Sequence, residues 1–188
     1  MAAGDTILSI CSRALLAIGA DEISSFEDGT IEAKVAKAKY DTAKKDLLAL
    51  YFWTFSLSES YLARSADEEL TIYKYLYALP EDCLRAVTVR EDSYNIDYTF
   101  RKGMINTDAD KPILLYVADC KEEFLPSYFI SLLIDRLARD FLIPITGKEE
   151  QYKIFDTIYQ TNFATAKSAD AQAKTPRKLN TNLLIGIR

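Results

Sequence analysis

The sequence contains no histidine among its 188 residues, and it holds only three cysteines and six glycines. Without an imidazole the chain cannot build a Ser-His-Asp or Cys-His nucleophile, a histidine metal site or a histidine pH switch. Cys11, Cys83 and Cys120 lie far apart with no C-x-x-C pair, which is typical of small buried residues rather than of a disulfide framework. No phosphate-loop, dinucleotide-binding or calcium-loop motif is present. We therefore expect neither an enzyme nor a cofactor or metal.

Long apolar runs and an excess of positive charge are also missing. No stretch approaches the roughly 20 apolar residues that cross a membrane, and the first residues lack a basic leader with a long apolar core. We expect a soluble protein that is made in the cytoplasm and has no membrane partner. The net charge of −5 argues against binding of nucleic acid over a broad basic surface.

Capping residues and apolar periodicity predict four helices. Asp5 or Thr6 can cap the first helix, Thr30 can cap the second, and Pro126 suits the first turn of the third. The helices are expected at residues 7–18, 31–50, 126–144 and 148–173. The aromatic segment 51–55 holds the only tryptophan, Trp53, which could stack against a ligand or anchor the core; we favour the core.

The region from about 70 to 120 has the period of strands. Residues 94–101 alternate apolar and polar side chains, Lys102-Gly103 predicts a hairpin turn, and residues 113–118 predict a further strand. We therefore expect an α+β fold that is mainly a bundle of about four helices with a small inserted antiparallel β-sheet. Residues 1–173 would form one domain, with the β-module inserted at about 70–120.

Adjacent carboxylates are the catalytic candidates that remain. Two carboxylates can hydrolyse a glycoside, and the chain offers Glu81-Asp82, Glu122-Glu123 and Glu149-Glu150. Neighbouring residues point apart, however, and the last pair fits the preference of a first helical turn for acids. A carboxylate hydrolase therefore stays a third hypothesis, which requires two acids to converge in one pocket.

Residues 174–188 differ from the rest of the chain, because they carry four basic residues and no acid. Removing this +4 from the total of −5 leaves −9 on residues 1–173. The segment is either a frayed terminus or an arm that docks on a neighbouring subunit or a partner, and its three consecutive aliphatic residues favour the arm. The expected partner-binding residues are Lys174, Arg177, Lys178, Leu183, Leu184, Ile185 and Arg188.

The order of several short motifs resembles that of the tail tubular protein A family, the head-to-tail adaptors of short-tailed bacteriophages. The resemblance covers nearly the whole chain through about Ala173, and it rests on the order of the motifs. They are the opening helix Ile7–Ala20, the segment Ile23–Phe26 with the Ala-rich helix after it, the aromatic Tyr51–Phe55, Tyr77–Arg85, and Leu142–Gly147 with its long following helix.

The resemblance implies a structural virion protein with a helical bundle and an inserted β-module. Members assemble as a dodecameric ring between the portal protein and the tail nozzle protein, and genome DNA passes through the centre without sequence-specific binding. The protein would be located in the virion, at the tail or neck, after synthesis in the host cytoplasm. The alternative hypothesis is a small monomeric or dimeric binding module that uses its aromatic-rich sheet to hold a ligand or peptide.

Overall fold

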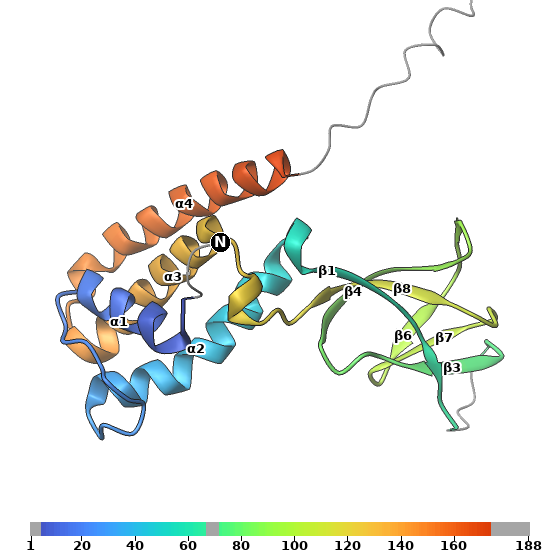
Figure 1. The fold of residues 1–188 in the computed structure, drawn as a ribbon, viewed down its shortest axis with the longest axis horizontal. Helices are drawn as coiled ribbons and strands as arrows, with labels where there is room; N and C mark the ends of the chain where they lie inside the picture. The colour runs from blue at the N-terminus through green and yellow to red at the C-terminus, as the bar shows by residue number, and fades with distance from the viewer. Residues whose placement is uncertain (1–4, 67–71, 174–188) are drawn as a thin grey trace, which may run out of the picture.

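The computed structural model describes residues 5–66 and 72–173, which form a helical part and a β part side by side (Figure 1). Helix α3 contacts each of the other three helices and lies at the centre of the helical part. The helices are α1 (Ile7–Ala17), α2 (Ile31–Leu50), α3 (Ser127–Thr146) and α4 (Tyr152–Gln172). Short 3₁₀ helices cover Thr54–Ser56, Glu122–Phe124 and Glu149–Gln151.

The starts of α1 and α2 follow the capping signals of the sequence, whereas α4 begins at Tyr152 rather than at the expected residue 148. The side chains of Thr6 and Thr30 accept hydrogen bonds from the backbone N–H groups three residues later, so both predicted N-caps are confirmed. The predicted end of α3 at Pro144 is wrong, because the helix continues to Thr146. Pro144 lacks the N–H that would bond to the carbonyl four residues earlier, but only two helical residues follow it, and Gly147 in the left-handed conformation closes the helix instead.

The strands form two antiparallel sheets of four. Sheet A has the order β1-β8-β4-β5, and sheet B has the order β2-β3-β7-β6. The strands are β1 (Leu57–Tyr61), β2 (Ala63–Arg64), β3 (Tyr75–Ala78), β4 (Cys83–Glu91), β5 (Tyr94–Asn95), β6 (Thr99–Arg101), β7 (Met104–Thr107) and β8 (Ile113–Ala118).

The expected fold class, a helical bundle with a small inserted sheet, is wrong. The protein is mixed α/β: helices hold 49% and strands 21% of the described residues, and the strands make two sheets of comparable size. The missed strands carry little β signal in the sequence. Strand β1 reads Leu-Ser-Glu-Ser-Tyr, and β2 has only two residues, both exposed. Hydrogen bonding to longer partner strands, rather than their own apolar pattern, holds such strands in a sheet.

The single strand expected over residues 94–101 is also wrong. Strand β5 pairs with β4 in sheet A, whereas β6 pairs with β7 in sheet B, so the chain changes sheets between them. The hairpin at Lys102-Gly103 is confirmed. Lys102 and Gly103 have φ values of 51° and 76°, the left-handed conformation that a tight two-residue hairpin turn requires.

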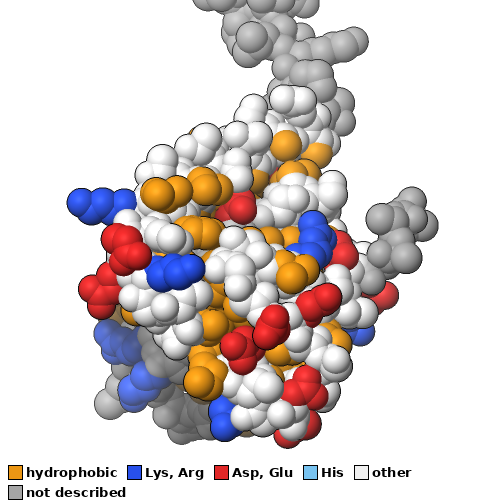
Figure 2. Space-filling view, turned by 90° about the vertical axis from the view of Figure 1, so that its left-hand side faces the viewer, with side chains coloured by type: hydrophobic (Ala, Val, Ile, Leu, Met, Phe, Trp, Pro, Cys, Tyr) orange, Lys and Arg blue, Asp and Glu red, His pale blue; other side chains and the backbone are white. Residues whose placement is uncertain are grey.

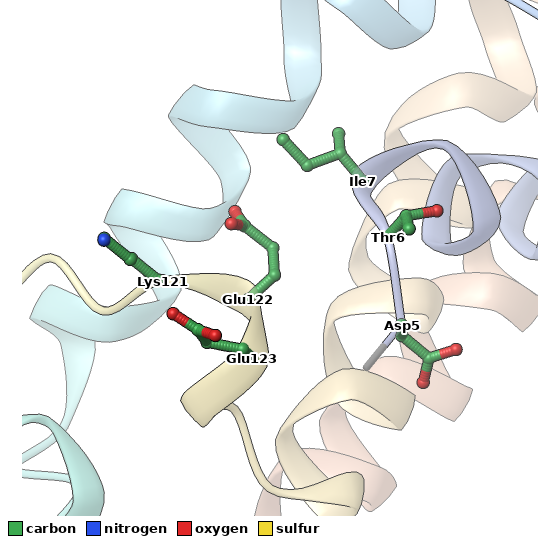
Figure 3. Close-up of a pocket in the computed structure, with 6 residues that line it drawn as sticks. All are labelled: Asp5, Thr6, Ile7, Lys121, Glu122 and Glu123. Atoms are coloured by element: carbon green, nitrogen blue, oxygen red, sulfur yellow. The ribbon is translucent and has the colours of Figure 1, made fainter. Parts of the chain in front are cut away.

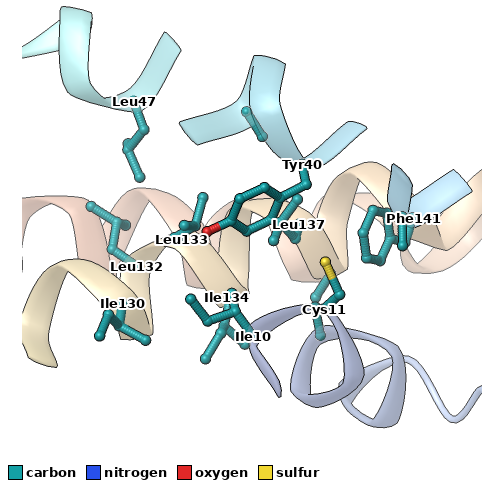
Figure 4. Packing of buried hydrophobic residues seen from close by; sticks show 14 of the residues in the cluster. Ile10, Cys11, Tyr40, Leu47, Ile130, Leu132, Leu133, Ile134, Leu137 and Phe141 are labelled. Carbon is teal, nitrogen blue, oxygen red and sulfur yellow. The ribbon is translucent and has the colours of Figure 1, made fainter. Parts of the chain in front are cut away.

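The protein has two hydrophobic cores. The larger lies among the helices, where Tyr40 of α2 and Cys11 of α1 both pack against α3 (Figure 4). Trp53 is fully buried in this core and donates its indole N–H to the Leu47 carbonyl at 2.9 Å, which confirms its expected role as a core anchor. The smaller core lies between the two sheets and includes Tyr77, Ile105 and Leu114. Sheet A contributes to both cores and therefore couples the β part to the helices.

Candidate functional site

The partner-binding residues expected from the sequence lie outside the described residues. Lys174, Arg177, Lys178, Leu183, Leu184, Ile185 and Arg188 all belong to the segment 174–188. The structure does show where this segment leaves the folded body, which is directly after the end of α4 at Gln172 and Ala173.

The end of α4 is fixed to two other elements by Asp170, which is fully buried. Its carboxylate accepts hydrogen bonds from the Thr54 backbone N–H at 2.9 and 3.0 Å and from the Thr54 hydroxyl at 2.9 Å. It also accepts one from the Tyr128 hydroxyl at 2.8 Å. Burial first, and then the hydrogen bond to Asp170, raises the pKa of Tyr128. One acid thus joins α4 to the start of α3 and to the entry of the β part.

The outer face of α4 is almost free of charge. Among the exposed residues of this helix only Lys153 is charged, whereas the exposed positions of α2 include Lys34, Lys37, Lys39, Asp41 and Asp46. Figure 2 views the helical end, and its upper region, where α4 lies, is mostly white and orange. Ile154 and Ile158 are 60% and 42% exposed.

The threonines of the α4 face are satisfied within the helix. Thr157, Thr161 and Thr165 donate their hydroxyl hydrogens to carbonyl oxygens four residues earlier, at 2.7, 2.9 and 3.2 Å. Because these hydroxyls are used internally, the face offers less hydrogen bonding to water than its composition indicates. A face with so few charged residues resembles the centre of protein contact surfaces, where charged residues are depleted.

Aromatic side chains are exposed on the β part. Tyr61 at the end of β1, Tyr94 of β5 and Phe100 of β6 have exposed fractions of 75%, 78% and 59%. Tyr61 and Tyr94 belong to the two edge strands of sheet A, whereas Phe100 belongs to an edge strand of sheet B. The aromatic-rich sheet of the alternative hypothesis therefore exposes three large rings at strand edges.

Most of the paired carboxylates do not converge. Asp82 accepts a hydrogen bond from the Tyr116 hydroxyl at 3.2 Å, and Glu81, Glu149 and Glu150 are exposed. Only Glu122 joins a buried polar cluster, where its carboxylate lies 3.1 Å from the ammonium group of Lys44 and 3.3 Å from the Tyr40 hydroxyl.

Lys44 is the centre of that cluster, and only 6% of it is exposed. Its ammonium nitrogen lies 3.0 Å from Asp119 Oδ1; this contact is an ion pair, since its angles fall outside hydrogen-bond geometry. Burial raises the pKa of Glu122, but its own backbone N–H and Lys44 lower it more, so the net pKa lies below its usual value. Glu122 is therefore held ionised and is poorly suited to act as a general acid.

A hollow of about 400 Å³ opens beside this cluster, between the start of α1 and the 3₁₀ helix Glu122–Phe124 (Figure 3). Its lining residues are Asp5, Thr6, Ile7, Lys121, Glu122 and Glu123. Figure 3 shows the Ile7 side chain extending towards Glu122 across the opening. Three acids and one lysine give the lining a net charge of −2.

A second cleft, of about 530 Å³, lies where α2, α3 and the start of α4 meet. Its two arginines are already paired: Arg136 donates to Asp140 at 2.8 Å, and Arg139 donates to Asp156 at 2.8 Å. Arg139 also lies 4.6 Å from the centre of the Tyr159 ring. These contacts join α3 to α4 and commit the guanidinium groups to structure.

The chemistry of the described residues gives no metal site and no activated thiol. Within residues 5–66 and 72–173 no group of three or more Cys, Asp or Glu side chains could hold a metal ion. Burial raises the pKa of the Cys11 thiol to about 12, so the thiol is protonated at neutral pH. None of the helices in this part of the chain is long and apolar enough to cross a membrane.

Comparison with known proteins identifies no relative: no protein-family model matches the chain, and no curated protein matches it either.

Proposed function

We propose that the protein is a structural virion component, a head-to-tail adaptor that forms a ring between the portal protein and the tail nozzle protein. The ring, dodecameric by analogy with the family that the sequence resembles, would let DNA pass through its centre without sequence-specific binding. The protein would act through contacts alone, with no cofactor, at the tail or neck of the virion. The order of motifs along the sequence supports this proposal.

The outer face of α4 is the structural observation that carries the proposal. A ring needs two different contact surfaces on each subunit, because every copy contacts its two neighbours in a head-to-tail manner. The weakly polar face with Ile154 and Ile158 is suited to one of these surfaces. The heavily charged exposed side of α2 is suited to solvent instead.

The distribution of charge is compatible with a channel for DNA. The charge of −9 on residues 1–173 would repel phosphates, whereas a dense basic lining would bind them and slow the passage of DNA.

Decoration of portal rings tests the proposal. Purified portal rings of a short-tailed phage are mixed with the full-length protein and imaged by electron microscopy. We expect a second ring stacked on the portal, and we expect Leu184→Asp, which places a charge in the aliphatic triplet, to reduce decoration. Bare portal rings under conditions where an established adaptor decorates them would contradict the proposal. If Leu184→Asp decorates portal rings as fully as the parent protein, the segment 174–188 takes no part in the contact with the portal.

The exposed rings of the β part favour the second candidate, a small monomeric or dimeric binding module. Tyr61, Tyr94 and Phe100 could pack against a peptide or other apolar ligand. A protein that leaves portal rings bare but loses the binding of a captured ligand after Tyr94→Ser would have this function instead.

A further inference from the structure

We propose that the hollow between the start of α1 and the 3₁₀ helix Glu122–Phe124 binds a basic, apolar peptide. Its occupant in the free protein is the segment 174–188 of the same chain. This contact goes beyond the adaptor function and does not depend on a ring. It concerns the subunit before it meets any partner.

The hollow offers both negative charge and apolar surface. Glu122 is already paired with Lys44, and Asp5 is paired with Arg13, so Glu123 is the lining acid left to face a ligand. Glu123 is exposed and makes no ion pair within the described residues. Ile7, which lines the hollow, is 37% exposed, and the neighbouring Phe124 is 66% exposed. A ligand that combines a cation with an aliphatic side chain would satisfy both features.

The segment 174–188 has the complementary composition. It carries a charge of +4, no acid, and the aliphatic triplet Leu183-Leu184-Ile185. The hollow offers the carboxylate of Glu123 and the side chain of Ile7, and the exposed Phe124 follows Glu123 in the sequence.

The point where the segment leaves the body favours the chain's own hollow over that of a second copy. Asp170, three residues before Ala173, bonds to Tyr128 at 2.8 Å, and Tyr128 follows Phe124 by only four residues. Residues 174–182 can span at most about 30 Å when extended. A tether of this length gives an effective concentration in the millimolar range. A second copy at micromolar concentration cannot match it.

Photo-crosslinking in the full-length protein tests the proposal. A benzoylphenylalanine replaces Leu184, the protein is irradiated at low micromolar concentration without portal, and mass spectrometry maps the products. We expect crosslinks within one chain to residues 5–7 and 121–124. Glu123→Lys should lower their yield roughly fivefold, which corresponds to about 1 kcal/mol. The matched control Glu150→Lys changes an exposed acid in the 3₁₀ helix that precedes α4, and it should leave the yield unchanged.

Three results would overturn the proposal. Crosslinks between two chains would assign the hollow to a second copy. If the crosslinks map to other surfaces, or if no crosslink forms, the segment 174–188 does not occupy the hollow. An unchanged yield in Glu123→Lys would remove the charge complementarity. Since the assay contains no portal, its failure is distinguishable from failure of the adaptor proposal.

Discussion

The side chain of Asp170 connects α4 to two other parts of the fold. It is fully buried, and it accepts hydrogen bonds from a backbone N–H and two hydroxyl groups on Thr54 and Tyr128. Buried polar groups in such a network are costly to leave unpaired. The carboxylate therefore holds the end of α4, and with it the exit of residues 174–188, against the helical core.

We predict that Asp170→Ala lowers the free energy of unfolding by about 3 kcal/mol, because it leaves the Thr54 N–H and two hydroxyls without their acceptor. Urea unfolding monitored by circular dichroism measures this loss. Asp170→Asn keeps one acceptor oxygen and should cost less than half as much. Equal losses in the two variants would show that the charge, rather than the hydrogen bonds, is what matters.

The cluster of Lys44 makes stability depend on pH. Burial lowers the pKa of Lys44, but its contacts with the carboxylates of Asp119 and Glu122 raise it more, so the net pKa lies above 10.5. The pKa of Glu122 lies below 4.5. The stabilisation from Glu122 is therefore present above pH 4.5 and is lost as the pH falls through its lowered pKa. That from Lys44 is present below pH 10.5 and is lost as the pH rises through its raised pKa.

We predict that Lys44→Met lowers the free energy of unfolding by about 2 kcal/mol near neutral pH. The variant should also lose less stability than the parent between about pH 5 and pH 3, because Glu122 no longer has a cation that lowers its pKa. Urea titrations across this range measure both effects. Lys37→Met, which removes an ion pair whose two side chains are 60% and 78% exposed, should change neither. Parallel pH profiles for Lys44→Met and the parent protein would contradict the prediction.

At the scale of elements, the helix ends depend on backbone conformation that single residues supply. Gly147 has a φ of 66° and donates its N–H to the Ile143 carbonyl at 2.9 Å, which ends α3 and turns the chain towards α4. Open space surrounds the position that a Cβ atom would take. The cost of a side chain there comes only from the left-handed conformation.

We predict that Gly147→Ala lowers the free energy of unfolding by about 1 kcal/mol. Thermal and urea unfolding measure the change. Ser168→Ala, an exposed substitution within α4, serves as the control and should stay within about 0.5 kcal/mol of the parent. If Gly147→Ala loses less than about 0.5 kcal/mol of unfolding free energy, the turn relaxes to another conformation.

The elements with strong local signals could be predicted from the sequence, and those held by distant partners could not. The caps Thr6 and Thr30 and the Lys102-Gly103 turn act over three or four residues, and all three are confirmed. Strands β1 and β2 owe their structure to partners far along the chain, since β1 pairs with β8. Local periodicity cannot reveal such pairs.

The same distinction applies to the candidate site. The buried positions of Lys44 and Asp170 were not predicted, because each has partners that lie 75 or more residues away in the sequence. A lone acid in the Ala-rich end of α4 was the only local signal for Asp170. The partner-binding residues in 174–188 lie outside the described residues and stay a prediction.

At the scale of the whole molecule, the protein joins a helical part and a two-sheet part through sheet A, which packs into both cores. The helical part presents a charged side on α2 and a weakly polar side on α4. This asymmetry is the physical basis of the proposed ring, because one face of each subunit is left to be covered by a neighbour.

The most direct test of the ring is the mass of the assembly that forms on portal rings. Mass photometry measures this mass for the parent protein, for Ile158→Lys and for the control Ala38→Lys. Both variants add one lysine to an exposed helical position, on the α4 face and on α2 respectively. We predict that the parent protein and Ala38→Lys form complete rings. Ile158→Lys should stay folded but fail to assemble, because it buries an unpaired charge between subunits. Full rings from Ile158→Lys would contradict the assignment of α4 as a subunit contact.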